Sequence, residues 1–215
     1  MTIDIEEKWS LFFERQHAFR RRYRSVWKVP LRRRHTDIVV ARCRPGLSVL
    51  EVGASDRNIF GKISLAHLDI NYLSCDRDRS LPHDFYSIDA VDRTFQQVWM
   101  FEVIEHVALE EGYRLLEKIF ALLEPGGELI LSTPNGHHPH RYREPHHKTP
   151  FKYDNLCALI EVAGFEVAEL YRLYNAPFLE KIAHRFFLAG LHRFLELDFA
   201  TTLAAVARKP VEPSR

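Results

Sequence analysis

Short apolar runs alternate with longer segments of helical periodicity along most of this chain. A short apolar run is typical of a buried parallel strand, and apolar residues at every third or fourth position are typical of a covering helix. We therefore expect strands near 47–52, 71–75, 83–86, 96–101, 127–133, 165–170 and 200–207. Helices are expected at 4–28, 34–41, 58–66, 103–106 with an extension through 110–123, 152–163 and 177–196.

This order of elements predicts an α/β fold, doubly wound, with a mostly parallel, seven-stranded, Rossmann-like sheet and an N-terminal helical extension. The basic helical extension covers residues 1–45, the domain covers 46–208, and a tail covers 209–215. A helical insertion at about 177–197 precedes the last strand. It either covers a substrate pocket or completes the core.

The composition is that of a globular protein, with 215 residues, 46% apolar residues, 27% charged residues and a net charge of +1. The three cysteines are odd in number and far apart, which predicts reduced thiols and a cytoplasmic protein. No apolar run is long enough to cross a bilayer, and no signal peptide is visible at the N-terminus.

Positive charge is concentrated near the N-terminus, where Arg15 to Arg34 contain nine Lys or Arg residues and no acid. Three interpretations stay open: a solvated helix face, a site for RNA or a phosphate-bearing substrate, and peripheral contact with an anionic membrane. The sequence does not predict an oligomeric state.

Two predicted strands end in an acid, Glu51 in the first and Asp76 in the second, and Gly53 follows the first. In doubly wound sheets, ligands bind beyond the carboxyl ends of the strands. A carboxylate such as Asp76 can accept hydrogen bonds from both ribose hydroxyls. These positions predict a nucleotide-like ligand.

With this order of elements, the chain resembles the class I S-adenosylmethionine-dependent methyltransferases over about residues 46–208. It is similar in detail to ubiquinone-pathway O-methyltransferases and to small-RNA terminal 2′-O-methyltransferases. Four segments carry the resemblance: Val49–Arg57, Ser74–Asp76, Phe95–Val107 and Leu122–Asn135.

The resemblance implies S-adenosyl-L-methionine as the cofactor and assigns roles to individual residues. Glu51 and Gly53 would hold the methionine end, and Asp76 would hold the ribose. Asp84 and Phe85 would flank the adenine, although Asp84 is equally well explained as a loop acid. The expected cofactor-binding set is Glu51, Gly53, Ala54, Ser55, Asp76, Asp84, Phe85 and Phe101.

Ser55 and Arg57 stand where the family has its second and third motif glycines. Glycine at such positions permits a positive φ or a close approach of the backbone to a ligand. These departures support one alternative, a non-catalytic partner protein with a degenerate first motif.

The segment Glu102-Val-Ile-Glu105-His106 places two carboxylates and an imidazole at helical spacing. Such a set can bind one divalent metal ion, with a fourth ligand from His146 or His147 in the histidine-rich loop after Asn135. The resemblance to the small-RNA family favours His147. A metal-free site is the alternative, with His106, His146 or His147 as the catalytic base. In that case the acids only favour the start of a helix.

The function that follows is methyl transfer from S-adenosylmethionine to a hydroxyl oxygen of a small or lipid-linked acceptor. RNA 2′-O-methylation is a second candidate, supported by the basic N-terminal stretch and by the pattern of acids and histidines.

Overall fold

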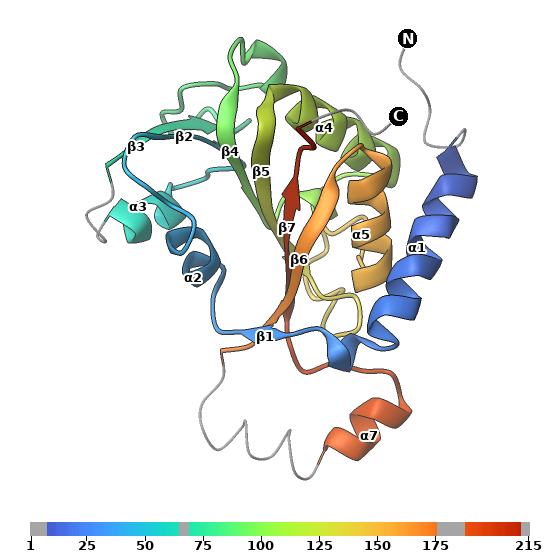
Figure 1. Ribbon diagram of the computed structural model, residues 1–215. Coiled ribbons are helices and arrows are strands. Elements are labelled where there is room, and N and C mark those ends of the chain that lie inside the picture. The colour runs from blue at the N-terminus through green and yellow to red at the C-terminus, as the bar shows by residue number, and fades with distance from the viewer. Residues whose placement is uncertain (1–7, 65–68, 176–187, 212–215) are drawn as a thin grey trace.

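The computed structural model describes residues 8–64, 69–175 and 188–211 and shows one seven-stranded sheet (Figure 1). The strand order is β1-β6-β7-β5-β4-β2-β3, and β7 runs antiparallel to both of its neighbours while the other pairs are parallel. The predicted mostly parallel, seven-stranded α/β fold is therefore confirmed. The strands are β1 (Leu31–Arg32), β2 (Leu47–Val52), β3 (Ile70–Cys75), β4 (Phe95–Phe101), β5 (Leu123–Pro134), β6 (Glu166–Leu173) and β7 (Thr202–Arg208).

Helices cover both faces of the sheet (Figure 1). One face carries α2 (His35–Val40) and α3 (Asn58–Ser64), and the other carries α1 (Trp9–Tyr23), α4 (Leu109–Leu122) and α5 (Tyr153–Val162). The short helix α7 (Ala189–Phe194) precedes β7, and three 3-10 turns complete the described elements: η2 (Val26–Lys28), η3 (Ile88–Ala90) and η4 (Ile104–His106). Among the described helices, none is long and apolar enough to cross a membrane.

The central strands are buried on both faces because their side chains point alternately to two apolar clusters. In β4, Val98 and Met100 pack with α1, α4 and α5, while Trp99 and Phe101 pack with α2 and α3. The continuous apolar runs in the sequence reflect this burial on both sides.

Helix α1 buries Phe12 and Phe19 against the core and leaves Phe13 exposed. The expected helix over 4–28 is too long, because Arg24 adopts a φ of 59° and stops α1 at Tyr23, well before Pro30. The part of that expectation on residues 1–7 lies outside the described residues.

The sheet includes β1, which was not expected, and lacks the strand expected at 83–86. Residues 83–86 form only an isolated bridge between Phe85 and Cys75, because the Asp84 carboxylate accepts the Ser74 N–H at 2.8 Å. That N–H would otherwise pair with a neighbouring strand. The seventh place is taken by β1, which lies parallel to the end of β6 at the opposite edge of the sheet.

The expected helix from 103 through 123 is also interrupted. Ile104–His106 form a 3-10 turn, Val107 and Ala108 are extended, and α4 begins only at Leu109. Of the expected helix at 177–196, residues 176–187 lie outside the described part, and α7 covers 189–194.

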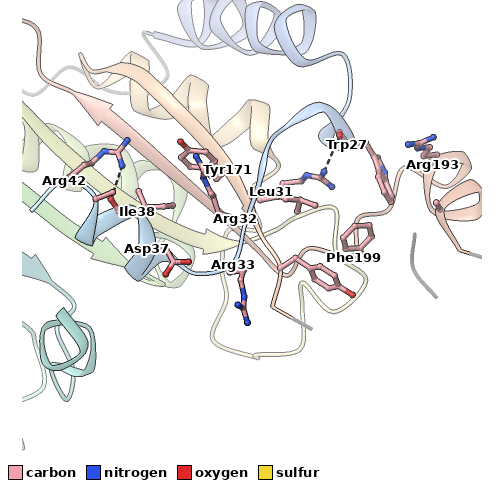
Figure 2. Close-up of a pocket in the computed structure, with 14 residues that line it drawn as sticks. Trp27, Leu31, Arg32, Arg33, Asp37, Ile38, Arg42, Tyr171, Arg193 and Phe199 are labelled. Carbon is pink, nitrogen blue, oxygen red and sulfur yellow. Dashed lines mark hydrogen bonds between the residues drawn. The ribbon is translucent and has the colours of Figure 1, made fainter. Parts of the chain in front are cut away.

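A cavity of about 960 Å³ lies beside β1, between α2, the end of β6 and α7 (Figure 2). Its lining combines aromatic side chains with arginines. Tyr171 and Arg32 lie together in its middle, and Trp27 and Arg193 lie together at the α7 end.

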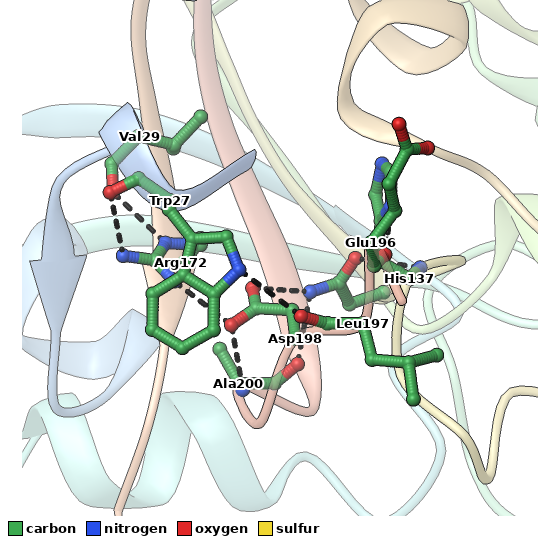
Figure 3. A network of polar contacts seen from close by, with 9 residues as sticks. Trp27, Val29, His137, Arg172, Glu196, Leu197, Asp198 and Ala200 are labelled. Atoms are coloured by element: carbon green, nitrogen blue, oxygen red, sulfur yellow. Dashed lines mark hydrogen bonds and ion pairs between the residues drawn. The ribbon is translucent and has the colours of Figure 1, made fainter. Parts of the chain in front are cut away.

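A buried polar network fixes this end of the sheet (Figure 3). Arg172 on β6 forms an ion pair with Asp198 at 2.8 Å, and both side chains are almost fully buried. The Arg172 guanidinium also donates to the carbonyls of Trp27 and Val29. Asp198 accepts a further hydrogen bond from the Asn135 side chain at 2.8 Å. The network thus joins the N-terminal segment, β6 and the loops that flank β7.

We predict that Asp198→Ala destabilises the fold by about 3–5 kcal/mol, because it leaves the Arg172 guanidinium buried without its counter-charge. The matched control is Arg208→Ala, which removes an exposed partner of Glu128 and should cost less than about 1 kcal/mol. Chemical denaturation of both variants measures the difference. Equal losses would show that the buried pair has no special role.

Candidate functional site

The turn after β2 requires glycine at position 53. Gly53 has a φ of +74°, and a Cβ built on it would lie only 2.2 Å from Val103 Cγ2. Its N–H donates to the Cys75 carbonyl at 2.8 Å, and Ala54 lies buried next to it. The turn is therefore held tightly between the ends of β3 and β4.

Ser55 and Arg57, the two residues in place of motif glycines, keep a glycine-like backbone, with φ values of 43° and 57°. The Ser55 N–H donates to Asp76 Oδ2 at 2.8 Å. The Arg57 guanidinium reaches away from the turn and donates to Ser74 Oγ at 2.8 Å and to the Pro82 carbonyl at 2.5 Å. The substitutions therefore preserve the path of the loop.

Glu51 and Asp76 lie at neighbouring strand ends in different environments. Glu51 is buried and accepts a hydrogen bond from the Tyr72 hydroxyl at 2.6 Å. Burial raises the pKa of Glu51 to about 7, and the Tyr72 hydrogen bond opposes that rise. Asp76 is half-buried and accepts backbone N–H groups from Ser55 and Asp78, which fixes the direction of its carboxylate.

The other expected cofactor residues surround the same strand ends. The Asp84 carboxylate accepts both the N–H and the hydroxyl of Ser74 at 2.8 Å, so it is bound to the protein itself. Phe85 bonds to Ser74 through its backbone. Phe101, at the end of β4, stacks on His35 of α2 with ring centroids 4.8 Å apart.

Next to this turn, three of the four expected metal ligands come together. Glu105, His106 and His147 each offer one ligand atom, and these atoms all lie within 4.8 Å of one another. Glu105 Oε2 accepts the Thr133 hydroxyl at 3.0 Å. Glu105 Oε1 and His147 Nδ1 are buried and have no hydrogen-bond partner in the described part of the chain. Buried polar atoms of this kind are rare unless they serve a ligand.

Glu102, the fourth expected ligand, lines the same cavity of about 390 Å³ as this cluster. Its carboxylate accepts the Ser132 hydroxyl at 2.7 Å, and its backbone adopts a φ of 53°. Glu105 and His106 lie in the 3-10 turn rather than in the expected α-helix, and Glu102 precedes that turn without joining their close group.

The electrostatics of the cluster favour its neutral forms. The surrounding protein, and then the charge of Glu105, raise the pKa of Glu102 to about 7. Burial raises the pKa of Glu105 to about 7. Burial and the neighbouring His147 lower the pKa of His106. A bound cation would offset the cost of ionising the two carboxyls.

The backbone holds His147 in place. The N–H groups of Lys148 and Thr149 donate to the Glu105 carbonyl at 2.7 and 3.1 Å. The His106 and His147 rings meet edge to face with centroids 4.9 Å apart. His146 is exposed and is not among the described residues that line the cavity, whereas His138 and His140 line it.

Sequence reasoning missed the residues that orient the acids. Ser132 and Thr133 near the end of β5 bind Glu102 and Glu105, and the Tyr72 hydroxyl binds Glu51. Ser132 and Thr133 could have been identified from the sequence, because they are a pair of polar residues at the carboxyl end of an apolar strand, where doubly wound folds place ligand sites.

Comparisons with known proteins identify the family of this chain. A family model described as a methyltransferase domain matches residues 19–188. A probable S-adenosylmethionine-dependent methyltransferase of Mycolicibacterium smegmatis is 26% identical over 180 residues, which cover 80% of this chain and 68% of the relative.

Two solved structures share the fold. The chain matches a SAM-dependent methyltransferase from Archaeoglobus fulgidus with a TM-score of 0.60 and 16% identity, covering 90% of this chain and 99% of the other. It matches the magnesium protoporphyrin IX methyltransferase of Synechocystis PCC 6803, solved with bound SAM, with a TM-score of 0.55 and 15% identity, covering 81% and 77%. Because the family match extends over most of its length, the chain belongs to the methyltransferase domain family.

Proposed function

We propose that this protein is an S-adenosylmethionine-dependent methyltransferase that acts on a hydroxyl oxygen of a small or lipid-linked acceptor. The observation that carries the proposal is that the glycine turn packs on the residue just before the turn that holds the acid–histidine cluster. Val103 packs on Gly53, and Glu105 and His106 follow Val103 in the 3-10 turn Ile104–His106. A methyl donor held by the turn would therefore lie beside groups that can bind or deprotonate a hydroxyl.

The cofactor contacts follow from the strand ends. The Asp76 carboxylate uses two backbone N–H groups for its orientation and keeps lone pairs for two ribose hydroxyls. Gly53 leaves its turn free of a side chain beside Val103, and the buried Glu51 precedes it by two residues at the end of β2. Holding the donor and the acceptor in line can supply much of the rate of methyl transfer.

One divalent metal ion fits the cluster, since two orphaned buried atoms, Glu105 Oε1 and His147 Nδ1, both belong to it. Glu105, His106 and His147 would hold the ion, and Glu102, which lines the same cavity, is the expected fourth ligand. Two carboxylates with two imidazoles would suit Mn²⁺, Fe²⁺ or Zn²⁺. When bound, such an ion lowers the pKa of a hydroxyl that it coordinates.

The protein groups have their own tasks in this site. Thr133 and Ser132 orient the two carboxylates, and the backbone of the 147–149 loop fixes the His147 ring. His106 has a lowered pKa and is therefore neutral near pH 7, as a proton acceptor or a metal ligand must be.

We predict that Gly53→Ala reduces S-adenosylmethionine affinity at least tenfold, because the new Cβ would collide with Val103 and the residue would be strained at positive φ. The control is Gly61→Ala in α3, where no atom lies within 4 Å of the new Cβ. That variant should bind normally. Isothermal titration calorimetry measures both affinities. A wild-type protein that binds neither the cofactor nor its demethylated product would instead be a non-catalytic partner protein.

We predict that the protein binds one Mn²⁺ ion and that Glu105→Gln or His147→Gln weakens this binding by at least tenfold. Affinity should fall as pH drops below about 7, because protons then compete for the Glu102 and Glu105 carboxylates. Calorimetry with Mn²⁺ across pH gives the readout, and His83→Gln, outside the cluster, is the control. Mn²⁺ affinity that is unaffected by either variant would contradict the metal proposal and favour a histidine base.

Methyl transfer itself is tested with radiolabelled S-adenosylmethionine and a panel of hydroxyl, amine and carboxyl acceptors. Labelling confined to hydroxyl acceptors is the expected result. Chelation should abolish it and added metal should restore it. Labelling of amines alone would contradict the oxygen acceptor while leaving cofactor binding intact.

A further inference from the structure

The α7 segment exposes an unusual concentration of large apolar side chains. Phe194 is 84% exposed, Leu191 is 54% exposed and Leu195 is 50% exposed, and Leu188 is exposed at the start of the helix. These positions are three or four residues apart, so they lie on one side of the helix. Leu31 on β1, across the cavity from α7, is exposed as well. Clusters of exposed apolar residues mark interaction surfaces more often than single ones do.

Arginines line the space next to this apolar surface (Figure 2). The Arg32 guanidinium lies 4.9 Å from the centre of the Tyr171 ring, and the Arg193 guanidinium lies 5.3 Å from that of Trp27. Arg33 lines the same cavity and is exposed. In the described part of the chain, none of the three guanidiniums forms an ion pair with a carboxylate. They are therefore available to an external anion.

The neighbouring segments carry a clear excess of positive charge. Residues 27–37 and 188–197 contain five Lys or Arg residues, while Asp37 and Glu196 are their acids. Arginine suits phosphate oxygens because its planar fork donates two hydrogen bonds at once.

We propose that this surface, formed by α7 and β1, docks the protein on an anionic phospholipid membrane. Lipid phosphates complement the guanidiniums, and the adjacent acyl chains complement Phe194, Leu191 and Leu195. An RNA would satisfy the arginines but leave the apolar side chains in water. A membrane is therefore the occupant that matches both halves of the surface.

The surface and the candidate site both lie at the end of the sheet where the parallel strands have their carboxyl ends. Strand register aligns Pro134 with Thr202, Thr202 with Leu173, and Leu173 with Arg32. Pro134 and Thr202 line the acid–histidine cavity, whereas Arg32 lines the α7 cavity. Docking would therefore turn the candidate site toward the lipid surface. Only this consequence rests on the proposed function; the docking itself does not.

The test is flotation of the full-length protein with vesicles of phosphatidylcholine, with and without phosphatidylglycerol. We expect binding only to the vesicles that contain phosphatidylglycerol, and we expect added salt to weaken it. The double variant Leu191→Ser, Phe194→Ser should lower the partition coefficient about tenfold or more, because it removes buried apolar area. Each of Arg33→Ser and Arg193→Ser should lower it about fivefold.

Val211→Ser and Arg44→Ser are the matched controls, since both residues are exposed and belong to neither segment. They should leave partition unchanged, and melting temperatures verify that every variant is folded. Failure of the wild type to bind phosphatidylglycerol vesicles overturns the proposal, as do controls that lose as much binding as the α7 variant. It is also overturned if Phe194→Ser abolishes a dimer, or short-RNA binding, while vesicle partition is unchanged. Cofactor affinity, measured in parallel, tests the proposed function separately.

Discussion

The buried ion pair between Arg172 and Asp198 is the constraint on which the rest of this edge of the sheet depends. Arg172 holds the carbonyls of Trp27 and Val29, and so fixes the chain that enters β1. The Asp198 carboxylate accepts a hydrogen bond from the Asn135 side-chain amide, and the side-chain oxygen Oδ1 of Asn135 in turn accepts the His137 N–H. An ion pair buried this deeply is tolerated only when its remaining hydrogen-bonding capacity is satisfied. Here backbone groups and an amide satisfy it, and the loops that they fix border both cavities.

The candidate site differs from this network, since two of its polar atoms are buried without a hydrogen-bond partner among the described residues. Glu105 has one carboxylate oxygen bound to Thr133 and one without a partner, and His147 has an unpartnered Nδ1. Burial raises the pKa of Glu105 from 4.5 to about 7, so the folded protein loses stability relative to the unfolded chain as the pH rises between these two values. A structure that needed only stability would place apolar side chains here. A ligand that paired with these atoms would offset this loss of stability.

Most of the fold followed from the sequence because the central strands are buried on both faces and are therefore continuous apolar runs. The two errors in the strands have different causes. Asp84 takes the Ser74 N–H that a strand at 83–86 would need, and Leu31–Arg32 form a strand too short for periodicity to reveal. The resemblance led us to Glu105, His106 and His147. Their orientation by Thr133 and by the 147–149 backbone depends on tertiary contacts that no local pattern encodes.

The two cavities at the carboxyl end of the sheet therefore differ in their chemistry, and the topology explains why they lie on the same side. The parallel strands have their carboxyl ends on the same side of the sheet. The antiparallel β7 begins on that side, just after the segment that contains Asp198. Glu102 and Glu105 line one of the two cavities there, together with Arg141 and Arg143, while Arg32, Arg33 and Arg193 line the other. A negatively charged acceptor would be attracted to the arginines and repelled by the free carboxylates. A cation bound by Glu102 and Glu105 would remove that repulsion, so the metal proposal and the membrane proposal are electrostatically compatible.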